Sequence, residues 1–436
     1  FMILFERLLY LSYAHLFFIL RPLLCFMCPK LKKRNLFEKK NTNDPACYSF
    51  SSQSQQAHVA FEVASEGELE QSFPVIHLFL SQGKRVELIY CSESVEDACQ
   101  KLYQNYPLTL RLLRLPILRL SPYSPYQNPL RWLTAPVLIF CRYDFFPQLL
   151  LYKNKKGKRL FLISAVLKNK SLFMRYLLKK FDFIVAANQI QRDGIQQMLN
   201  LAPDKISFAD FRLLQIAERH QNASLKFKNY SFMPELQQKL ASYPKENRLI
   251  LGNLWQEDLF LLEHPVLKEK IQKGEMQLTI IPHKLDPLNV ELLIKKINAI
   301  FSVNVLRLKK DDEMVKDFSG ILILDVKGLL CELYTLYGVA YVGGGFGVSV
   351  HSLLEPYLAN CKTLCGPYIE RSSEYDYIMS IETNNAPIVI QDSESFMQSL
   401  NNRTSFVFSG GKNSLQSVQE VLKQIEHKIL KGDVCT

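Results

Sequence analysis

Glycine is scarce in this sequence, with only 17 glycines among 436 residues. The one dense cluster, GGGFG at residues 343–347, matches neither common nucleotide motif. The dinucleotide pattern G-x-G-x-x-G requires a sixth-position glycine where the chain has Val348 or Val350, and no G-K-[ST] ending follows. The cluster therefore excludes the standard dinucleotide fingerprint and the P-loop, and it needs another explanation.

A long uncharged run is also missing. The first apolar stretch, residues 8–20, has thirteen residues, and Arg7 and Arg21 flank it, whereas a membrane-spanning helix needs about 20. No small-residue cleavage site of a signal peptide follows it. An apolar helix followed by PKLKKR favours a segment lying on an anionic membrane surface. The alternative is a helix packed on its own domain, with a basic tail in solvent.

Positive charge is unevenly distributed. Of the net charge of +11, residues 1–40 carry +6, from eight Lys/Arg and two Glu. The rest of the chain is only mildly basic and has no recognisable nucleic-acid module. We therefore expect an anionic membrane surface as a partner and no nucleic acid.

Paired cysteine motifs are nearly absent. The chain has ten cysteines, of which only Cys25 and Cys28 form a C-x-x-C pair, inside an apolar run and with no second pair to face it. This pattern predicts reduced thiols in a cytosolic compartment and no zinc site.

Short apolar segments alternate with helical ones along most of the chain, which is typical of a mostly parallel α/β sheet. The predicted strands are residues 58–63, 85–90, 136–142, 159–165, 183–187, 248–252, 277–282, 304–308, 321–325, 339–342, 362–365 and 386–390. The predicted parts are a membrane-associated segment (1–40), a first Rossmann-like domain (41–215), a linker (216–246), a second Rossmann-like domain (247–412) and a C-terminal helix (413–436). Two such domains suggest a ligand between them.

The glycine cluster falls at a predicted strand-to-helix turn, after residues 339–342. Backbone amides of such a turn can approach an anion, and the helix dipole adds to the attraction. His351 and Glu355 are four residues apart and are expected on one face of a helix starting near Ser349. They lack a third metal ligand. A nucleotide pocket, with Glu355 accepting ribose hydroxyls, and a simple capping turn with a surface pair both fit.

A second turn, in HVAFEVASEGELE, places Glu68 in the first turn of a predicted helix. With Ser65 it forms the spacing of a capping box. A carboxylate beside a helix N-terminus is also suited to act as a general base. The spacing alone does not separate these two interpretations.

Together these segments resemble the Kdo transferases, which add 3-deoxy-D-manno-octulosonic acid (Kdo) to lipid A precursors at the bacterial inner membrane. The most specific segments are AYVGGGFGVSVHSLLEP and GPYIERSSEY, and the similarity extends over nearly the whole chain. Supporting segments are RYDFFP, LISA, ADFR, GNLWQED, IIPHKLD and LDVKGLLCELY.

The resemblance implies an inverting, metal-independent glycosyltransferase of the GT-B type, with two Rossmann-like domains facing across a cleft. It needs no cofactor, uses CMP-Kdo as donor and a lipid A precursor as acceptor, and acts on the cytoplasmic side of the inner membrane. By the same resemblance Glu68 is the general base that deprotonates the acceptor hydroxyl. The residues implied to bind the nucleotide sugar are Asn253, Pro282, His283, Gly328, Gly343, Gly344, Gly345, Phe346, Gly347, His351, Ser352 and Glu355. Ser65, Gly67, Arg142 and Arg212 are candidates for binding the acceptor or other anionic groups.

The chain departs from the family pattern at several positions. Glu66 adds a second carboxylate to the turn of Glu68, Ser352 replaces the usual Asn, and Phe146 stands where Trp is common. Val348 and Ser349 replace a basic residue and a glycine. The rival hypotheses are a GT-B transferase for another nucleotide sugar, an inactive membrane-bound scaffold of the same fold, and, resting on charge alone, a nucleic-acid-binding protein.

Overall fold

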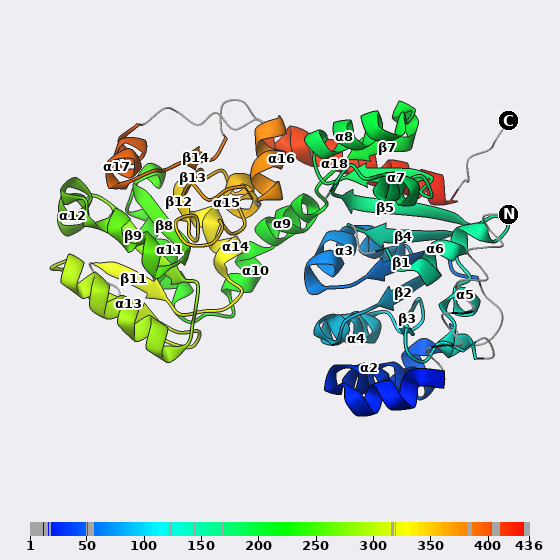
Figure 1. Ribbon diagram of the computed structural model, residues 1–436. Coiled ribbons are helices and arrows are strands. Elements are labelled where there is room, and N and C mark those ends of the chain that lie inside the picture. The colour runs from blue at the N-terminus through cyan, green and yellow to red at the C-terminus, as the bar shows by residue number, and fades with distance from the viewer. Residues whose placement is uncertain are drawn as a thin grey trace. The chain divides into compact units, whose positions relative to one another are not determined.

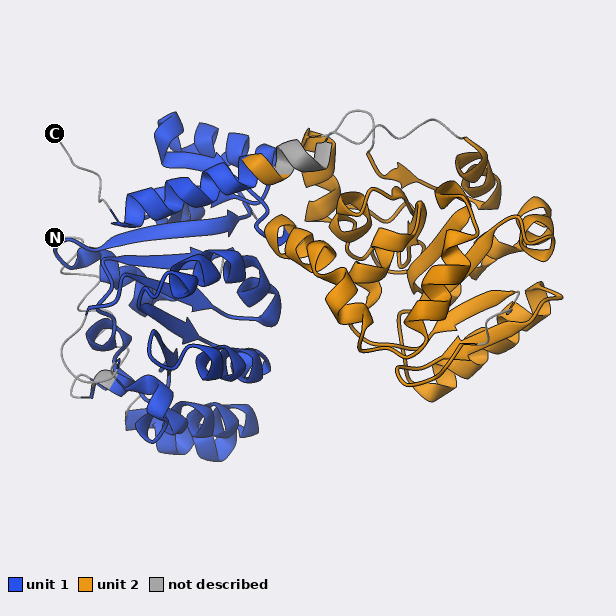
Figure 2. Ribbon diagram, turned by 180° about the vertical axis from the view of Figure 1, so that it is seen from behind, with its two compact units in different colours: residues 1–212, 417–436 blue, residues 213–416 orange. Residues whose placement is uncertain are grey.

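The computed structural model describes residues 12, 16, 19–48, 50, 56–121, 124–142, 145–167, 169–314, 318, 320–370, 372–381, 386–402 and 410–430. The chain divides into two compact units (Figures 1 and 2). Unit 1 comprises residues 1–212 and 417–436, and unit 2 comprises residues 213–416.

The described part of unit 1 contains a seven-stranded parallel sheet in the order β3-β2-β1-β4-β5-β6-β7. Its strands are β1 (Val59–Val63), β2 (Val86–Tyr90), β3 (Leu110–Arg114), β4 (Val137–Cys141), β5 (Arg159–Ala165), β6 (Phe183–Ala186) and β7 (Ile206–Phe208). Its helices are α2 (Pro29–Lys39), α3 (Glu66–Ser81), α4 (Glu96–Asn105), α5 (Pro129–Trp132), α6 (Pro147–Leu150), α7 (Leu172–Leu178) and α8 (Gln189–Leu199). Helix α18 (Gly410–Leu430) returns to this unit, where Gln82 Nε2 donates to Glu426 Oε1 at 2.7 Å.

The described part of unit 2 contains a second seven-stranded parallel sheet in the order β10-β11-β9-β8-β12-β13-β14. Its strands are β8 (Arg248–Leu254), β9 (Gln277–Pro282), β10 (Val305–Leu308), β11 (Ile321–Leu324), β12 (Val339–Val342), β13 (Lys362–Cys365) and β14 (Ile388–Val389). Its helices are α9 (Arg212–Gln221), α10 (Ala223–Phe227), α11 (Met233–Ala241), α12 (Pro265–Gln272), α13 (Pro287–Ile300), α14 (Leu330–Leu333), α15 (Leu354–Leu358), α16 (Ser373–Ile381) and α17 (Ser393–Asn401).

Helices cover both faces of the second sheet because both faces are apolar. Successive residues of a strand point to opposite faces. On β8, Leu249 and Leu251 belong to a core that includes residues of α12, α13 and α17, whereas Ile250 belongs to a core with residues of α10 and α11. A sheet buried on both faces explains the continuous apolar strands of the sequence. The predicted α/β fold is confirmed.

Each of the twelve predicted strands is present, with ends shifted by a few residues at most. Two strands were not predicted, β3 and the three-residue β7. Strand β3 carries Arg111 and Arg114, and these charged residues break the apolar run by which the other strands were recognised in the sequence. Both side chains are buried, and each pairs with a carboxylate, Arg111 with Glu87 and Arg114 with Glu96 at 2.6 Å.

The segment predicted as a linker, residues 216–246, is instead largely helical. It contains most of α9 and the whole of α10 and α11, and it belongs to unit 2. Phe227, Leu236 and Leu240 contribute to the core on one face of the second sheet. Polar residues on the outer faces of these helices made the stretch look like a connection.

The N-terminal 40 residues also divide into two parts. Residues 19–27 are helical and expose large apolar side chains, with Phe26 90% exposed. Helix α2 is instead anchored to unit 1, where the buried Glu38 accepts from the backbone N–H of Leu118 at 3.0 Å and of Arg119 at 2.7 Å. Arg34 pairs with Glu38 at 2.7 Å.

Candidate active site

The carboxyl ends of β8 and β12 form the switch point of the second sheet, because β9 lies on one side of β8 and β12 on the other. Ligands of parallel α/β sheets bind beyond the strands at such a point. Strand β8 ends at Leu254 and β12 ends at Val342, so Trp255 and the glycine loop, residues 343–347, both lie here. Asn253, a predicted nucleotide-binding residue, is the second-last residue of β8 and has φ 52°.

Two glycines of the loop are required by close contact with the chain's own backbone. A Cβ on Gly343 would collide with the carbonyl of Asn253. A Cβ on Gly345 would lie 2.7 Å from both N and Cα of Gly366. Close packing of protein backbone therefore accounts for these two glycines.

The other two glycines differ from each other. Gly344 has φ 94°, a conformation that disfavours other residues, and its Cβ would lie 2.5 Å from the carbonyl oxygen of Ser349. Gly347 has ordinary space, since the nearest atom to its Cβ would be Trp255 Cε3 at 3.6 Å. Protein packing does not explain why residue 347 is a glycine. Close approach of a ligand to the backbone is the explanation that remains to be tested.

Three amides of the loop already have partners within the protein. The N–H of Gly343 donates to Gly252 O at 2.9 Å, and that of Gly347 donates to Gly344 O at 3.1 Å. The N–H of Gly344 donates to Asp258 Oδ2 at 3.1 Å. These three amides are thus committed to holding the loop's shape, and a phosphate would have to use other donors.

Asp258 is the residue that holds the glycine loop against the end of β8. Its side chain is fully buried and accepts from the backbone N–H of Trp255 at 2.9 Å and from the hydroxyl of Tyr341 at 2.8 Å, besides Gly344. Burial raises the pKa of this carboxyl, and the three hydrogen bonds oppose that rise. One carboxylate thereby joins β12, the glycine loop and the turn after β8.

Three aromatic rings stack beside this loop. The rings of Trp255 and His283 lie 4.4 Å apart, and those of His283 and His351 lie 4.5 Å apart. Trp255 Nε1–H donates to His351 Nε2 at 3.0 Å, so this nitrogen carries no proton. Burial lowers the pKa of both histidines, and the stack is therefore neutral near pH 7.

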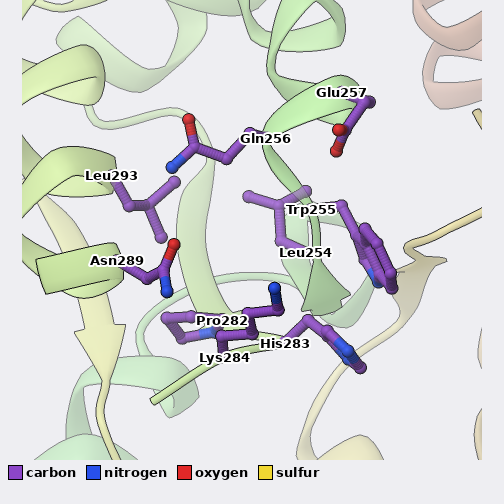
Figure 3. Close-up of a pocket in the computed structure, with 9 residues that line it drawn as sticks. All are labelled: Leu254, Trp255, Gln256, Glu257, Pro282, His283, Lys284, Asn289 and Leu293. Atoms are coloured by element: carbon purple, nitrogen blue, oxygen red, sulfur yellow. The ribbon is translucent and has the colours of Figure 1, made fainter. Parts of the chain in front are cut away.

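A cavity of about 250 Å³ adjoins the stack at the ends of β8 and β9 (Figure 3). Its polar side chains include Gln256, Asn289 and His283, and Lys284 and Glu257 supply one charge of each sign (Figure 3). The lining residues are Leu254, Trp255, Gln256, Glu257, Pro282, His283, Lys284, Asn289 and Leu293. Flat rings, amides and one cation suit a nucleotide, which offers a planar base and anionic phosphate.

The prediction that His351 and Glu355 share a helix face is wrong. Helix α15 begins at Leu354, so His351 and Ser352 lie in the preceding loop. His351 joins the aromatic stack, whereas Glu355 lies 3.7 Å from the guanidinium of Arg219. The predicted helix does not begin at Ser349, because residues 344–353 form turns and a loop.

Other predicted residues of unit 2 have definite places. Pro282 ends β9 directly before His283. Phe346 packs edge-to-face on Phe260 at 4.9 Å, toward the core rather than the cavity. Gly328, with φ 78°, forms the turn between β11 and α14.

Glu68 lies at the corresponding switch point of unit 1, where β1 passes into α3 between β2 and β4. Ser65 caps α3, with Oγ accepting from the N–H of Glu68 at 3.3 Å. The Glu68 carboxylate turns back and accepts from the N–H of Ala64 at 2.6 Å, so a capping arrangement is present. Glu68 is 3% exposed, whereas Glu66 points to solvent. A Cβ on Gly67 would meet no atom within 4 Å.

Arg142 lies at the same edge of the sheet, directly after β4, the strand that pairs with β1. It follows β4 with φ 65°, and its Nε is buried with no hydrogen-bond partner among the described residues. Burial and then the charge of Glu68 raise the pKa of the Cys141 thiol, while the charge of Arg142 opposes this rise. Glu68 and Arg142 therefore act on one small region, as an acceptor site would require.

Arg212 is less available, because its guanidinium pairs with Asp210 at 2.5 Å. Among the described residues, no three His, Cys, Asp or Glu side chains are grouped so as to hold a metal ion. Nor does any helix in that part of the chain have the length and apolarity needed to cross a membrane.

Sequence reasoning missed Trp255, Asp258 and Gly366. Trp255 was detectable as one of only two tryptophans, placed at the end of a predicted strand. Asp258 follows it by three residues, a spacing that allows its carboxylate to reach the preceding backbone. Gly366 opens the segment GPYIERSSEY, but the sequence does not show its contact with Gly345, because that contact joins two different strand ends.

Two parallel α/β units with ligand-binding features at their switch points define the GT-B class of fold. A solved structure of UDP-GlcNAc 2-epimerase from Neisseria meningitidis, bound to UDP-GlcNAc, has a TM-score of 0.54 at 10% identity, covering 84% of this chain and 99% of that one. A glycosyltransferase from Rickettsia africae has a TM-score of 0.50 at 12% identity, covering 87% and 100%. These similarities establish the fold alone.

Sequence comparison shows which proteins the chain is similar to. The family model described as 3-deoxy-D-manno-octulosonic-acid transferase (kdotransferase) matches residues 31–210. The 3-deoxy-D-manno-octulosonic acid transferase of Chlamydia trachomatis serovar D is 23% identical over 391 residues, 84% of this chain and 85% of that protein. The enzyme of that name from Rickettsia typhi is 23% identical over 396 residues, 85% and 77%. The chain is therefore similar to Kdo transferases over most of its length, and it is a glycosyltransferase.

Proposed function

We propose that the protein transfers Kdo from CMP-Kdo to a lipid A precursor at the cytoplasmic face of the inner membrane, with inversion and without a metal or other cofactor. The observation that carries this proposal is the position of Glu68, at the carboxyl edge of β1 and in the first turn of α3, with Arg142 at the end of the neighbouring strand β4. Similarity to Kdo transferases supports Kdo as the sugar, and the cavity of unit 2 supports a nucleotide donor.

The reaction follows from these groups. The Glu68 carboxylate takes the proton of an acceptor hydroxyl, and the oxygen then attacks the anomeric carbon of Kdo. The bond from that carbon to the CMP phosphate oxygen breaks, and CMP leaves as an anion. Arg142 is placed to bind an anionic group of the acceptor near Glu68. Lys284 and the neutral stack of Trp255, His283 and His351 would hold the departing nucleotide.

The N-terminal segment supports the proposed location. The helix of residues 19–27 exposes Ile19 (71%), Phe26 (90%) and Met27 (71%). Helix α2 follows with Lys30, Lys32 and Lys33 exposed. Apolar side chains beside clustered lysines suit the surface of an anionic bilayer.

The test is transfer from CMP-Kdo to a tetraacyl lipid A precursor by the purified full chain, with product detected by mass spectrometry. Glu68→Gln keeps an oxygen that can accept from the Ala64 N–H but removes the base, so we expect transfer to fall about 10²- to 10⁴-fold. Glu66→Gln is the matched control, because it removes the exposed carboxylate of the same turn, and it should transfer normally. Equal activity of Glu68→Gln and wild type would refute the role of Glu68 as the general base.

A second candidate is a transferase for another nucleotide sugar. It is favoured by the departures of Val348, Ser349 and Ser352 from the family pattern in and after the glycine loop. Product with UDP-GlcNAc and none with CMP-Kdo would establish this alternative. Absence of any nucleotide binding would favour the inactive scaffold.

A further inference from the structure

A cluster of charged side chains joins four helices of unit 2. It consists of Arg219 on α9, Lys226 on α10, Glu332 on α14 and Glu355 on α15. Glu332 is 2% exposed, although a buried carboxylate is costly unless it is paired. The network compensates this cost with two cations.

The guanidinium of Arg219 is held rigidly by Glu332. Nε donates to Glu332 Oε1 at 2.8 Å and Nη2 to Oε2 at 2.9 Å, which is the bidentate arrangement that fixes both planes. Burial works against the charge of Glu332, but the hydrogen bonds from Arg219 and Lys226 outweigh it and hold the pKa of this carboxyl below its usual value. Arg219 therefore has a single well-defined orientation.

In that orientation Arg219 contacts two of the predicted donor-binding elements. Nη1 lies 3.7 Å from Glu355 Oε1, an ionic contact longer than a hydrogen bond. Nη2 lies 3.4 Å from the carbonyl oxygen of Gly328, in the turn between β11 and α14. The side chains of Arg219 and Glu355 are 35% and 20% exposed, so this face of the network is reachable from solvent.

We propose that Arg219 is a positioning residue for the nucleotide donor, which orients the Glu355 carboxylate toward the ribose hydroxyls and holds the Gly328 turn beside it. The proposal rests on the proposed function and on the prediction from the sequence that Glu355 accepts those hydroxyls. Arg219 touches no ligand itself and acts through Glu355. Discrimination between ribose and 2′-deoxyribose is the property that a correctly oriented carboxylate confers and a merely stable fold does not.

Lys226 provides a matched control within the same cluster. It donates to Glu332 Oε1 at 2.9 Å and to the Gly328 carbonyl, as Arg219 does. Removing either cation leaves Glu332 with one cation fewer. Removal of Arg219 also removes its ionic contact with Glu355.

The experiment measures the affinity of the full chain for CMP and for 2′-deoxy-CMP by calorimetry, with thermal unfolding of each variant recorded alongside. Arg219→Gln should weaken CMP binding about tenfold while leaving 2′-deoxy-CMP nearly unchanged, so the ribose preference should collapse as it does in Glu355→Gln. Arg219→Lys keeps the charge but not the bidentate fork, and it should restore part of the preference. Lys226→Gln should lower thermal stability as Arg219→Gln does but keep the preference of the wild type.

The possible results distinguish a failure of this inference from a failure of the proposed function. Loss of preference in Glu355→Gln but a normal preference in Arg219→Gln would overturn the role of Arg219 and leave the proposed function standing. An equal loss in Arg219→Gln and Lys226→Gln would also overturn it, because general weakening of the cluster would then explain both. No CMP binding by the wild type would instead refute the proposed donor.

Discussion

Replacing Gly345 by alanine tests whether the glycine loop is shaped by its own backbone packing. The new Cβ would lie 2.7 Å from N and Cα of Gly366 and 2.9 Å from its carbonyl carbon. Ordinary contact begins at 3.4 Å, so the two strand ends must separate by roughly 0.7 Å. All three obstructing atoms belong to the backbone, and no side-chain rotation can relieve them. We expect a loss of about 1–3 kcal/mol in the free energy of unfolding of unit 2, the usual cost of overpacking.

Gly347→Ala is the matched control in the same loop. Its Cβ would be 3.6 Å from Trp255 and would meet no closer atom, so we expect stability within about 0.5 kcal/mol of wild type. A phosphate that approaches the backbone at this glycine would be obstructed by the methyl group. CMP affinity should therefore fall in Gly347→Ala although its stability is retained.

Urea unfolding followed by the fluorescence of Trp255 reports on the affected region directly. The chain has two tryptophans, so Trp132→Phe in every protein of the series leaves Trp255 as the sole indole. Equal urea midpoints for Gly345→Ala and Gly347→Ala would refute the packing argument. Normal CMP affinity in Gly347→Ala would remove that glycine from the nucleotide site.

Two further predictions concern other parts of the molecule. Gly67→Ala adds a methyl group that meets no protein atom in the first turn of α3, so stability should hold or rise by up to about 1 kcal/mol. Transfer should fall at least about tenfold in that variant, because an acceptor beside Glu68 would collide with the methyl group; unchanged transfer would place the acceptor elsewhere. Burial lowers the pKa of His220 from 6.5 to about 4, so the neutral ring contributes stability that is complete above pH 6.5 and is lost as pH falls to about 4. The loss in the free energy of unfolding should approach about 3 kcal/mol. Thermal unfolding of His220→Gln across that pH range should therefore depend less on pH than that of the wild type. The same pH dependence in both proteins would show that His220 is not the group responsible.

The order of strands and helices could be predicted because each strand of a doubly covered parallel sheet is itself a short apolar run. Strand β3 escaped prediction for the opposite reason, since the buried charges of Arg111 and Arg114 depend on partners far away in sequence. Helices α9 to α11 escaped it because their apolar faces are narrow and are covered only by unit 2.

The candidate site likewise has features that could be predicted from local sequence and features that could not. The turn at Glu68 was predictable because the cap of Ser65 and the helix start are local features. The partners of Glu355 and His351 were not, because four-residue spacing implies a shared face only if a helix is already present, and α15 begins too late.

The sequence by itself determined where chain reversals, strand ends and candidate polar groups fall, since these follow from local spacing and from the conformational freedom of glycine. Tertiary structure alone decided what each glycine meets, that Asp258 holds the loop, and that Trp255, His283 and His351 form one stack. The physical reason is that β8, β9 and β12 are far apart along the chain, and only parallel pairing in one sheet brings their carboxyl ends to a common edge.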